Sequence, residues 1–314
     1  MKRTDKTVAF IGAPTDIGAA HRGSSMGPEA LRVAGLGNML ERLGLRVTDL
    51  GNLTGPANPN QAPQNGYRHL HETVQWCTSL HDAVYEALNA DLLPIIMGGD
   101  HALAVGSIAA IARYCAERDT PLSVLWLDAH ADFNTPETSP SGNIHGMPVA
   151  ILCGKGPPEL TDLGHALPAV DTAHFNQLGI RSVDHVEKRA VVESGMPVFD
   201  MRIIDERGMR SVMEEILNGV ARRGAHLHVS FDVDFLDPVI APGVGTTVTG
   251  GPTYREAQLC MEMIHDCGLM RSLDIMELNP AMDNRNQTAE LVVELVASLF
   301  GEQILSRHEG SVPS

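Results

Sequence analysis

The stretch VLWLDAHADFN, residues 124–134, places polar side chains directly behind a run of apolar residues. Asp128, His130 and Asp132 occupy alternate positions after that run. Side chains alternate between the two faces of a strand, so alternate residues point the same way. The pattern therefore predicts a buried strand over 122–130 that delivers two acids and a histidine to one spot near its carboxyl end.

Strand and helix patterns alternate along the rest of the chain. Strands are predicted over 8–14, 46–51, 92–99, 122–130, 177–182, 197–200, 226–234 and 272–278. Helices are predicted over 28–43, 68–90, 101–118, 208–223, 254–267 and 288–300, and loops over 51–66 and 154–171. Such alternation, with strands apolar on both faces, is typical of a parallel sheet covered on both sides. We expect a single α/β domain over residues 1–314, with three layers and a mostly parallel eight-stranded sheet.

The composition excludes several classes of function. The formal net charge of −16 repels phosphate backbones and anionic lipid, which argues against nucleic-acid binding, although solubility alone also explains it. No apolar run approaches the roughly 20 residues of a membrane span, and no secretory signal is recognisable. The 5 cysteines are scattered and odd in number, as in a reduced, cytoplasmic protein. We expect a cytoplasmic protein that binds neither nucleic acid nor membrane.

Two other predicted strands also end in polar residues. The run IIMGGDH delivers His101, and the run HLHVSFDVD delivers Asp232 and Asp234. Parallel sheets place their functional sites at the carboxyl ends of their strands. One such cluster is weak evidence, because acids behind a strand are often loop residues or helix caps, and His101 can simply begin a helix. Three clusters together predict a shared site at this edge of the sheet.

The charge of the predicted site indicates metal ions. Four buried carboxylates repel one another unless a cation lies between them, and two divalent ions balance four aspartates with neutral histidines. Oxygen and imidazole ligands without a thiolate favour Mn²⁺ over a structural zinc site, with Fe²⁺, Co²⁺ or Ni²⁺ as alternatives. Bridging carboxylates would hold two ions about 3.5 Å apart, where a shared hydroxide forms near neutral pH.

These motifs resemble the signatures of a known family. GGDHALAVGS, DAHADFN and SFDVDFLDP are similar to the three signatures of the ureohydrolases, the binuclear manganese hydrolases that remove urea from guanidino compounds. The similarity extends from residues 11–32 to residues 286–301. Within that family the chain is most similar to the arginase branch, chiefly through NTPETSPSGNIHGMPVA, residues 134–150.

The resemblance implies two Mn²⁺ per subunit and a role for each site residue. The first ion would be bound by His101, Asp128, Asp132 and Asp232, and the second by Asp128, His130, Asp232 and Asp234. The reaction itself would depend on His145 as a proton shuttle, on Glu277 and on Asp132. Substrate would be contacted by Asn134, Ser141, Asp184 and Glu187 at its α-carboxylate and α-amino groups, and by Thr246 and Glu277 at its guanidinium.

The residue chemistry agrees with two of these roles. Glu277 ends an apolar run and suits a cationic guanidinium through charge-assisted hydrogen bonds, although a structural acid is equally consistent with that position. His145 lies on a predicted loop, and its ordinary pKa near 6.5 suits a general acid for a departing amine. Its alternative role is to cap a helix.

Three functions remain open. The first is hydrolysis of L-arginine to L-ornithine and urea by a metal-bridging hydroxide. The second is action on agmatine, guanidinobutyrate or a related guanidino acid, which the loop SPSGNIHG disfavours because a decarboxylated substrate needs no partner for an α-carboxylate. The third is a non-catalytic, metal-stabilised regulatory subunit.

The resemblance also implies a homotrimer or homohexamer, with Arg255 and Glu256 at a possible subunit contact. Ser182, Pro140 and residues 245–251 depart from the commoner family pattern, which leaves the fine substrate preference open.

Overall fold

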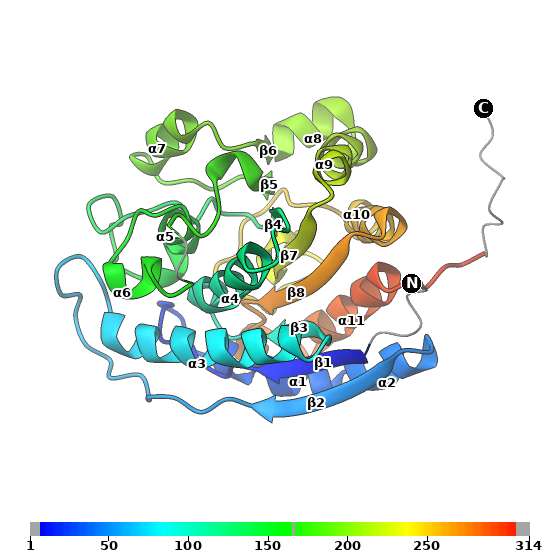
Figure 1. Ribbon diagram of the computed structural model, residues 1–314, viewed down its shortest axis with the longest axis horizontal. Coiled ribbons are helices and arrows are strands. Elements are labelled where there is room, and N and C mark those ends of the chain that lie inside the picture. Colours follow the sequence, from blue (N-terminus) through cyan, green and yellow to red (C-terminus); the bar gives the residue numbers. More distant parts are fainter. Residues whose placement is uncertain (1–6, 165–166, 306–314) are drawn as a thin grey trace.

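A parallel sheet runs through the middle of the computed structural model, which describes residues 7–164 and 167–305 (Figure 1). The strands are β1 (Thr7–Gly12), β2 (Arg46–Asn52), β3 (Leu93–Met97), β4 (Leu122–Leu127), β5 (Phe175–Ile180), β6 (Val198–Asp200), β7 (His226–Asp232) and β8 (Met270–Met276). Their order is β2-β1-β3-β8-β7-β4-β5-β6, and all neighbouring pairs are parallel. The predicted α/β fold is confirmed.

Helices cover both faces of this sheet (Figure 1). They are α1 (Gly27–Val33), α2 (Leu36–Arg42), α3 (Leu70–Asn89), α4 (Ala104–Ala116), α5 (Pro148–Leu152), α6 (Pro158–Thr161), α7 (Glu187–Ser194), α8 (Met201–Arg207), α9 (Met209–Arg223), α10 (Tyr254–Cys267) and α11 (Gln287–Leu299). Short 3-10 helices are η2 (Ser24–Met26), η3 (His101–Leu103), η4 (Ile144–Gly146), η5 (Thr172–His174), η6 (Val233–Phe235) and η7 (Pro280–Met282). Side chains of α3, α4 and α5 pack on one face, and those of α1, α2, α9, α10 and α11 on the other.

Some predicted elements differ from the observed ones. The helix predicted over 28–43 is divided in two, because Gly35 adopts a left-handed backbone with φ 84° between α1 and α2. Helices α5 to α8 were not predicted, since segments of 4 to 8 residues are too short to show helical periodicity. One of them, α6, lies in the segment 154–171 that was predicted to be a loop. Strand β4 ends at Leu127, before the predicted boundary at residue 130.

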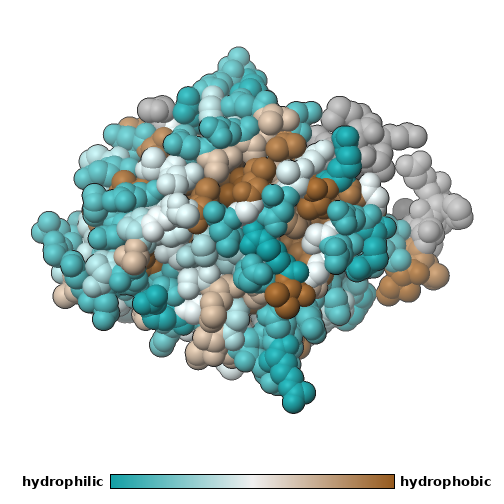
Figure 2. All heavy atoms as spheres, turned by 90° about the horizontal axis from the view of Figure 1, so that it is seen from below, coloured by the Kyte–Doolittle hydropathy of each residue, from teal (hydrophilic) through white to brown (hydrophobic). Residues whose placement is uncertain are grey.

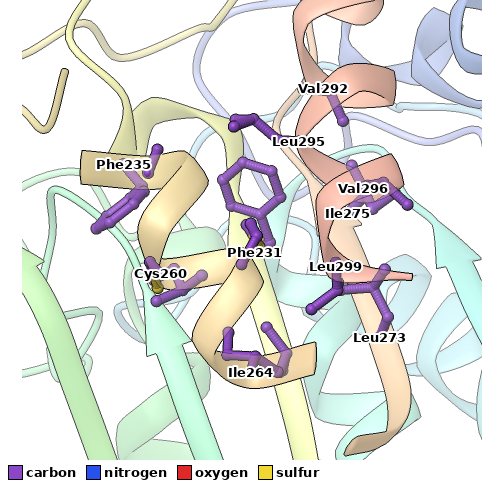
Figure 3. Packing of buried hydrophobic residues seen from close by; sticks show 14 of the residues in the cluster. Phe231, Phe235, Cys260, Ile264, Leu273, Ile275, Val292, Leu295, Val296 and Leu299 are labelled. Atoms are coloured by element: carbon purple, nitrogen blue, oxygen red, sulfur yellow. The ribbon is translucent and has the colours of Figure 1, made fainter. Parts of the chain in front are cut away.

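The largest core cluster packs α10 and α11 against β7 and β8, as Figure 3 shows. Phe231 and Ile275 come from the two strands, and Ile264 and Val296 from the two helices. Each is at most 1% exposed, and full burial of such a side chain is worth about 1.5–3 kcal/mol. This packing holds the carboxyl ends of β7 and β8 in place, and both ends carry site residues.

The surface is largely polar. Seen from below the view of Figure 1, hydrophilic residues dominate, and hydrophobic side chains gather mainly near the middle of that face (Figure 2). Within the described residues, no helix combines the length and the hydrophobicity that a membrane crossing requires.

Candidate active site

The strand order brings together polar side chains that are far apart in the sequence. Strands β3, β8, β7 and β4 are successive neighbours in the sheet. His101 opens η3 shortly after β3, Asp128 follows β4 directly, and Asp232 is the last residue of β7. Glu277 follows β8 directly. The four carboxyl ends therefore face one region, as the sequence predicted.

Three aspartates at these strand ends use the same local turn. In each, one carboxylate oxygen accepts a hydrogen bond from the backbone N–H two residues later, which is the turn chemistry typical of aspartate. The bonds join Asp100 to Ala102 at 3.0 Å, Asp128 to His130 at 2.6 Å, and Asp232 to Asp234 at 2.7 Å. These turns, rather than the predicted strand alternation, make the polar side chains converge, because β4 ends before Asp128 and Asp132 has φ 48°.

The side chains form two groups that suit metal binding. Nδ1 of His101 lies 2.9 Å from Asp232 Oδ2 and 3.1 Å from Asp128 Oδ2. It is also 3.6 Å from Asp132 Oδ2. Nδ1 of His130 lies 3.1 Å from Asp234 Oδ2 and 3.5 Å from Asp128 Oδ1. In each group the possible ligand atoms of three residues lie within 4.8 Å of one another, and Asp128 belongs to both groups.

The electrostatics of this cluster call for a cation. Burial, followed by repulsion from neighbouring aspartates, raises the pKa of Asp132 and of Asp232 well above the ordinary value. Burial also opposes the ionised form of Asp128, but hydrogen bonds with His101 and His130 outweigh it and lower its pKa. Burial opposes the charged form of both imidazoles, but Asp128 beside His101, and Asp234 with Asp128 beside His130, outweigh it and raise their pKa values. The buried acids therefore favour positive charge at this centre, and the oxygen and imidazole donors fit divalent metal ions.

Two further residues orient His101 and were not predicted. Its Nε2 lies 2.9 Å from Ser230 Oγ, which leaves Nδ1 facing the acids. Its ring stacks on Trp126 with centroids 3.9 Å apart, and Trp126 Nε1 donates to Asp128 Oδ2 at 2.9 Å. Partners of this kind fix the orientation of a metal-binding imidazole. The signal was present in the sequence, since Ser230 and Trp126 each precede a site aspartate by two positions.

His145 and Glu277 form a pair at the edge of the cluster. His145 Nδ1 lies 2.9 Å from Glu277 Oε1, and the same oxygen accepts the backbone N–H of His101 at 3.0 Å. Burial opposes both charges, but their mutual hydrogen bond raises the pKa of His145 and lowers that of Glu277. The backbone of Glu277 is left-handed, with φ 62°. Such strain in a residue other than glycine is concentrated at functional sites.

Asp100 supports His145 through a backbone link that the sequence analysis missed. Its Oδ2 accepts the N–H of Gly18 at 2.9 Å, and the carbonyl of Gly18 accepts the N–H of His145 at 3.2 Å. Burial, reinforced by the nearby Glu277 carboxylate, raises the pKa of Asp100 to about 7. The peptide of Gly18 thus ties the residue before His101 to the loop that carries His145.

An open cavity lies above the cluster, and most of the predicted site residues line it. These are His130, Asp132, Asn134, Ser141, His145, Asp184, Glu187, Asp232, Asp234, Thr246 and Glu277. His101 and Asp128 lie beneath its floor and are 1% and 0% exposed. The structure therefore brings together all residues that the sequence analysis singled out for the site.

The residues predicted to contact substrate are already linked to one another. Asn134 Nδ2 donates to Asp184 Oδ2 at 3.0 Å, and Thr246 Oγ1 donates to Asp234 Oδ2 at 2.9 Å. The two oxygens of Glu187 accept backbone N–H groups, from Phe133 at 2.7 Å and from Asp184 at 3.0 Å. Burial raises the pKa of Glu187. Glu187 therefore fixes the backbone of two segments that line the cavity, those of Phe133 and Asp184.

The loop that carries Ser141 rests on the long segment after β2. The backbone N–H of Arg68 donates to the carbonyl of Gly142 at 2.8 Å. Gly142 has φ 71°, and a Cβ there would lie 2.9 Å from the carbonyl oxygen of Gly66. Glycine is therefore required at position 142 both for its conformation and for this close approach. The segment predicted as a loop over 51–66 thus forms part of the support of the cavity.

Comparisons with known proteins agree with this architecture. The profile of the arginase family matches residues 6–301. An arginase from Agrobacterium fabrum is 45% identical over 303 residues, which cover 96% of this chain and 93% of that one. The native arginase structure from Bacillus caldovelox superposes with a TM-score of 0.91 at 41% identity, covering 96% of this chain and 100% of that one. The Entamoeba histolytica arginase, solved in complex with L-ornithine, has a TM-score of 0.87 at 30% identity and covers 95% and 99%. The chain therefore belongs to the arginase family.

Proposed function

We propose that this protein hydrolyses L-arginine to L-ornithine and urea, using two manganese ions per chain. The proposal depends chiefly on the two ligand groups that share Asp128. They lie beneath a cavity that is lined in part by Glu277. The similarity to arginases over nearly the whole chain supports the same activity.

The residues that would hold the two ions combine the two groups described above with the ligand sets that the family resemblance implies. The first ion is assigned to His101, Asp128, Asp132 and Asp232, and the second to Asp128, His130, Asp232 and Asp234. When bound, such a pair of cations supplies an activated water at neutral pH and stabilises charge that develops on the attacked group. The hard oxygen and imidazole donors support manganese as the resident metal.

The remaining chemistry belongs to the side chains around the cavity. The reaction joins the oxygen of water to the guanidinium carbon and breaks the bond from that carbon to the side-chain nitrogen. Glu277 is the buried carboxylate that binds the cationic guanidinium and orients it over the aspartates. The departing nitrogen needs a proton, and we assign its delivery to His145, because the Glu277 carboxylate favours the protonated imidazole and raises its pKa.

The outer part of the cavity suits the α-amino acid end of the substrate. Asn134 and Ser141 are hydrogen-bonding groups suited to an α-carboxylate, and Asp184 is an acid suited to an α-ammonium. We assign Glu187 to the same end, but as the residue that holds Asp184 and Phe133 in place. A decarboxylated substrate would leave these polar groups unpaired, which lowers its reactivity.

A urea-release assay over a panel of guanidino compounds, with Mn²⁺ added, tests this function. We expect kcat/KM for L-arginine to exceed that for agmatine and for 4-guanidinobutyrate by at least about 10²-fold. A faster reaction with either of those compounds would replace the proposal by the second ureohydrolase reading. Release of no urea from any compound by fully metal-loaded protein would favour the non-catalytic regulatory subunit.

Two further predictions accompany the proposed function. A homotrimer or homohexamer is expected from the family resemblance, and light scattering of the purified protein measures it. Arg255 and Glu256, the residues predicted at a subunit contact, lie at the start of α10, where Glu256 completes a capping box with Thr253. A cytoplasmic location stays a prediction that fractionation tests.

A further inference from the structure

Arg181 is a partly buried cation that lies behind the candidate metal centre, directly after β5. Its guanidinium nitrogens donate hydrogen bonds to five backbone carbonyls from separate segments of the chain. The acceptors are Gly179 at 3.2 Å, Asp234 at 2.8 Å, Phe235 at 3.0 Å, Leu236 at 3.2 Å, and Val248 at 2.8 and 3.1 Å. Among the residues that the structure describes, it forms no ion pair with a carboxylate.

These carbonyls belong to the segments that carry one half of the site. Asp234 is a member of the second ligand group, and Val248 belongs to the loop that carries Thr246. Thr246 in turn donates to the carboxylate of Asp234. A Cβ at Gly251 would lie 2.6 Å from an Arg181 nitrogen, so the loop closes tightly over the guanidinium. Arg181 thus joins η6, which follows β7, to the loop that contacts the Asp234 side chain.

The charge of Arg181 acts on the same region. Burial lowers the pKa of Arg181, and the field of the nearby acids, Asp234 first and then Asp128, opposes that effect. Without a carboxylate of its own among the described residues, the guanidinium presents its positive charge to the acidic cluster as a whole. Asp128 is shared by both groups, but His101 of the first group is anchored differently, through Ser230 and the ring of Trp126, and has no bond to Arg181 among those described.

We propose that Arg181 is a positioning residue for the second ligand group, Asp128, His130 and Asp234. It fixes the backbone of Asp234 and the Thr246 loop, so that its loss weakens the binding of one metal ion more than the other. The proposal rests on the two-metal function proposed above. If Arg181 only stabilised the fold, its substitution would lower the melting temperature and would not change the affinity of one metal site more than that of the other.

The experiment compares Arg181→Lys and Arg181→Gln with Arg271→Lys and Arg271→Gln. Arg271 is a matched control, because its guanidinium also donates to backbone carbonyls, those of Gly268 and Met270, but it lies at the amino end of β8. Each protein is freed of metal by chelation and titrated with Mn²⁺ by calorimetry. The fraction of chains that hold two adjacent Mn²⁺ ions is measured by the spin-coupled signal in electron paramagnetic resonance. Melting temperatures of the metal-free proteins are measured alongside.

In Arg181→Lys, which retains the charge but not the planar fork of donors, we expect the affinity of one Mn²⁺ site to change by less than about 3-fold. The affinity of the other site should fall by at least about 10-fold, as is common when a residue behind a metal ligand is changed. Both Arg271 variants should bind the two ions normally. Unchanged affinities at both sites in Arg181→Lys, or equal losses at both sites, would overturn the proposal. Arg181→Lys decides the matter should Arg181→Gln fail to fold. If the unmodified protein did not bind two Mn²⁺ ions, the proposed two-metal function itself would fail.

Discussion

The candidate metal-binding cluster and the loop over residues 134–146 meet in one cavity but are built in different ways. The cluster stands on the carboxyl ends of adjacent strands, where core packing fixes the backbone. The loop contains only the short helix η4, and backbone bonds to Arg68 and Gly18 hold it. Damage to the cluster should therefore stop the chemistry for every substrate. Damage to the loop should instead change which substrate is preferred.

Removal of metal should give the largest effect. Prolonged chelation should abolish urea release and lower the melting temperature, because the buried acids then repel one another and no bound ion stabilises the folded state. At a concentration one hundred times Kd, each ion bound only by the folded state adds about 2.7 kcal/mol of stability. Re-addition of Mn²⁺ should restore both properties better than Mg²⁺ does. Full activity in protein shown by elemental analysis to lack metal would contradict the two-metal proposal.

Asp128→Asn should be the most damaging substitution of a single ligand. Asp128 belongs to both ligand groups, so its loss removes charge from two sites, and kcat should fall by at least about 10³-fold. Asp232→Asn should follow, since we assign Asp232 to both ions as well. Asp234→Asn is the comparison, because it belongs to one group. Metal content per chain should fall furthest for the first two, and equal content in all three would show that the shared ligands are wrongly assigned.

His145→Asn tests whether a residue of the loop takes part in the chemistry at the cluster. His145 comes from the loop but contacts Glu277 at the cluster. We expect kcat to fall by about 10²–10⁴-fold, the usual contribution of a positioned proton donor, while metal content stays near normal. Loss of metal from this variant would make His145 a ligand instead.

Gly142→Ala should affect the loop without affecting the cluster. Its control is Gly44→Ala, which has a similar positive φ of 82° but open space around it. Both variants should lose about 1–2 kcal/mol from backbone strain, measured by denaturant unfolding. Only Gly142→Ala should raise KM for L-arginine, because its Cβ presses on Gly66. An equal rise of KM in both variants would show that the contact between Gly142 and Gly66 has no specific role in substrate binding.

The smallest expected effect is that of Asn134→Ala combined with Ser141→Ala. The preference for L-arginine over agmatine should shrink by about 10-fold, mainly because arginine reacts more slowly. Metal content should not change. If kcat/KM fell equally for every guanidino compound, these residues would only shape the loop.

The same contrast explains what could be predicted from the sequence. All eight strands were recognisable, and residues such as Asp128 and Asp232 stood out because charge follows an apolar run. Residues that act through distant partners did not stand out. Ser230 meets His101 across 129 positions, and Arg68 meets the loop through its backbone, which no side-chain pattern records.

Backbone geometry accounts for the remaining differences. The break at Gly35 depends on a left-handed residue inside a periodic segment, and a glycine there is compatible with either one helix or two. Arg181 could not be singled out from the sequence, because its acceptors are carbonyls that every residue carries. Carbonyl positions become known only when the chain is folded.

The position of β8 between β3 and β7 also has a consequence for biosynthesis. Strand β8, the last strand among the described residues, lies between the strands that deliver His101 and Asp232. These two side chains reach their 2.9 Å separation only after β8 has been inserted. A nascent chain still held on the ribosome before residue 270 therefore lacks a complete metal centre. If the two-metal proposal holds, metal loading would follow the synthesis of β8, and a chain truncated ahead of β8 would bind no pair of metal ions.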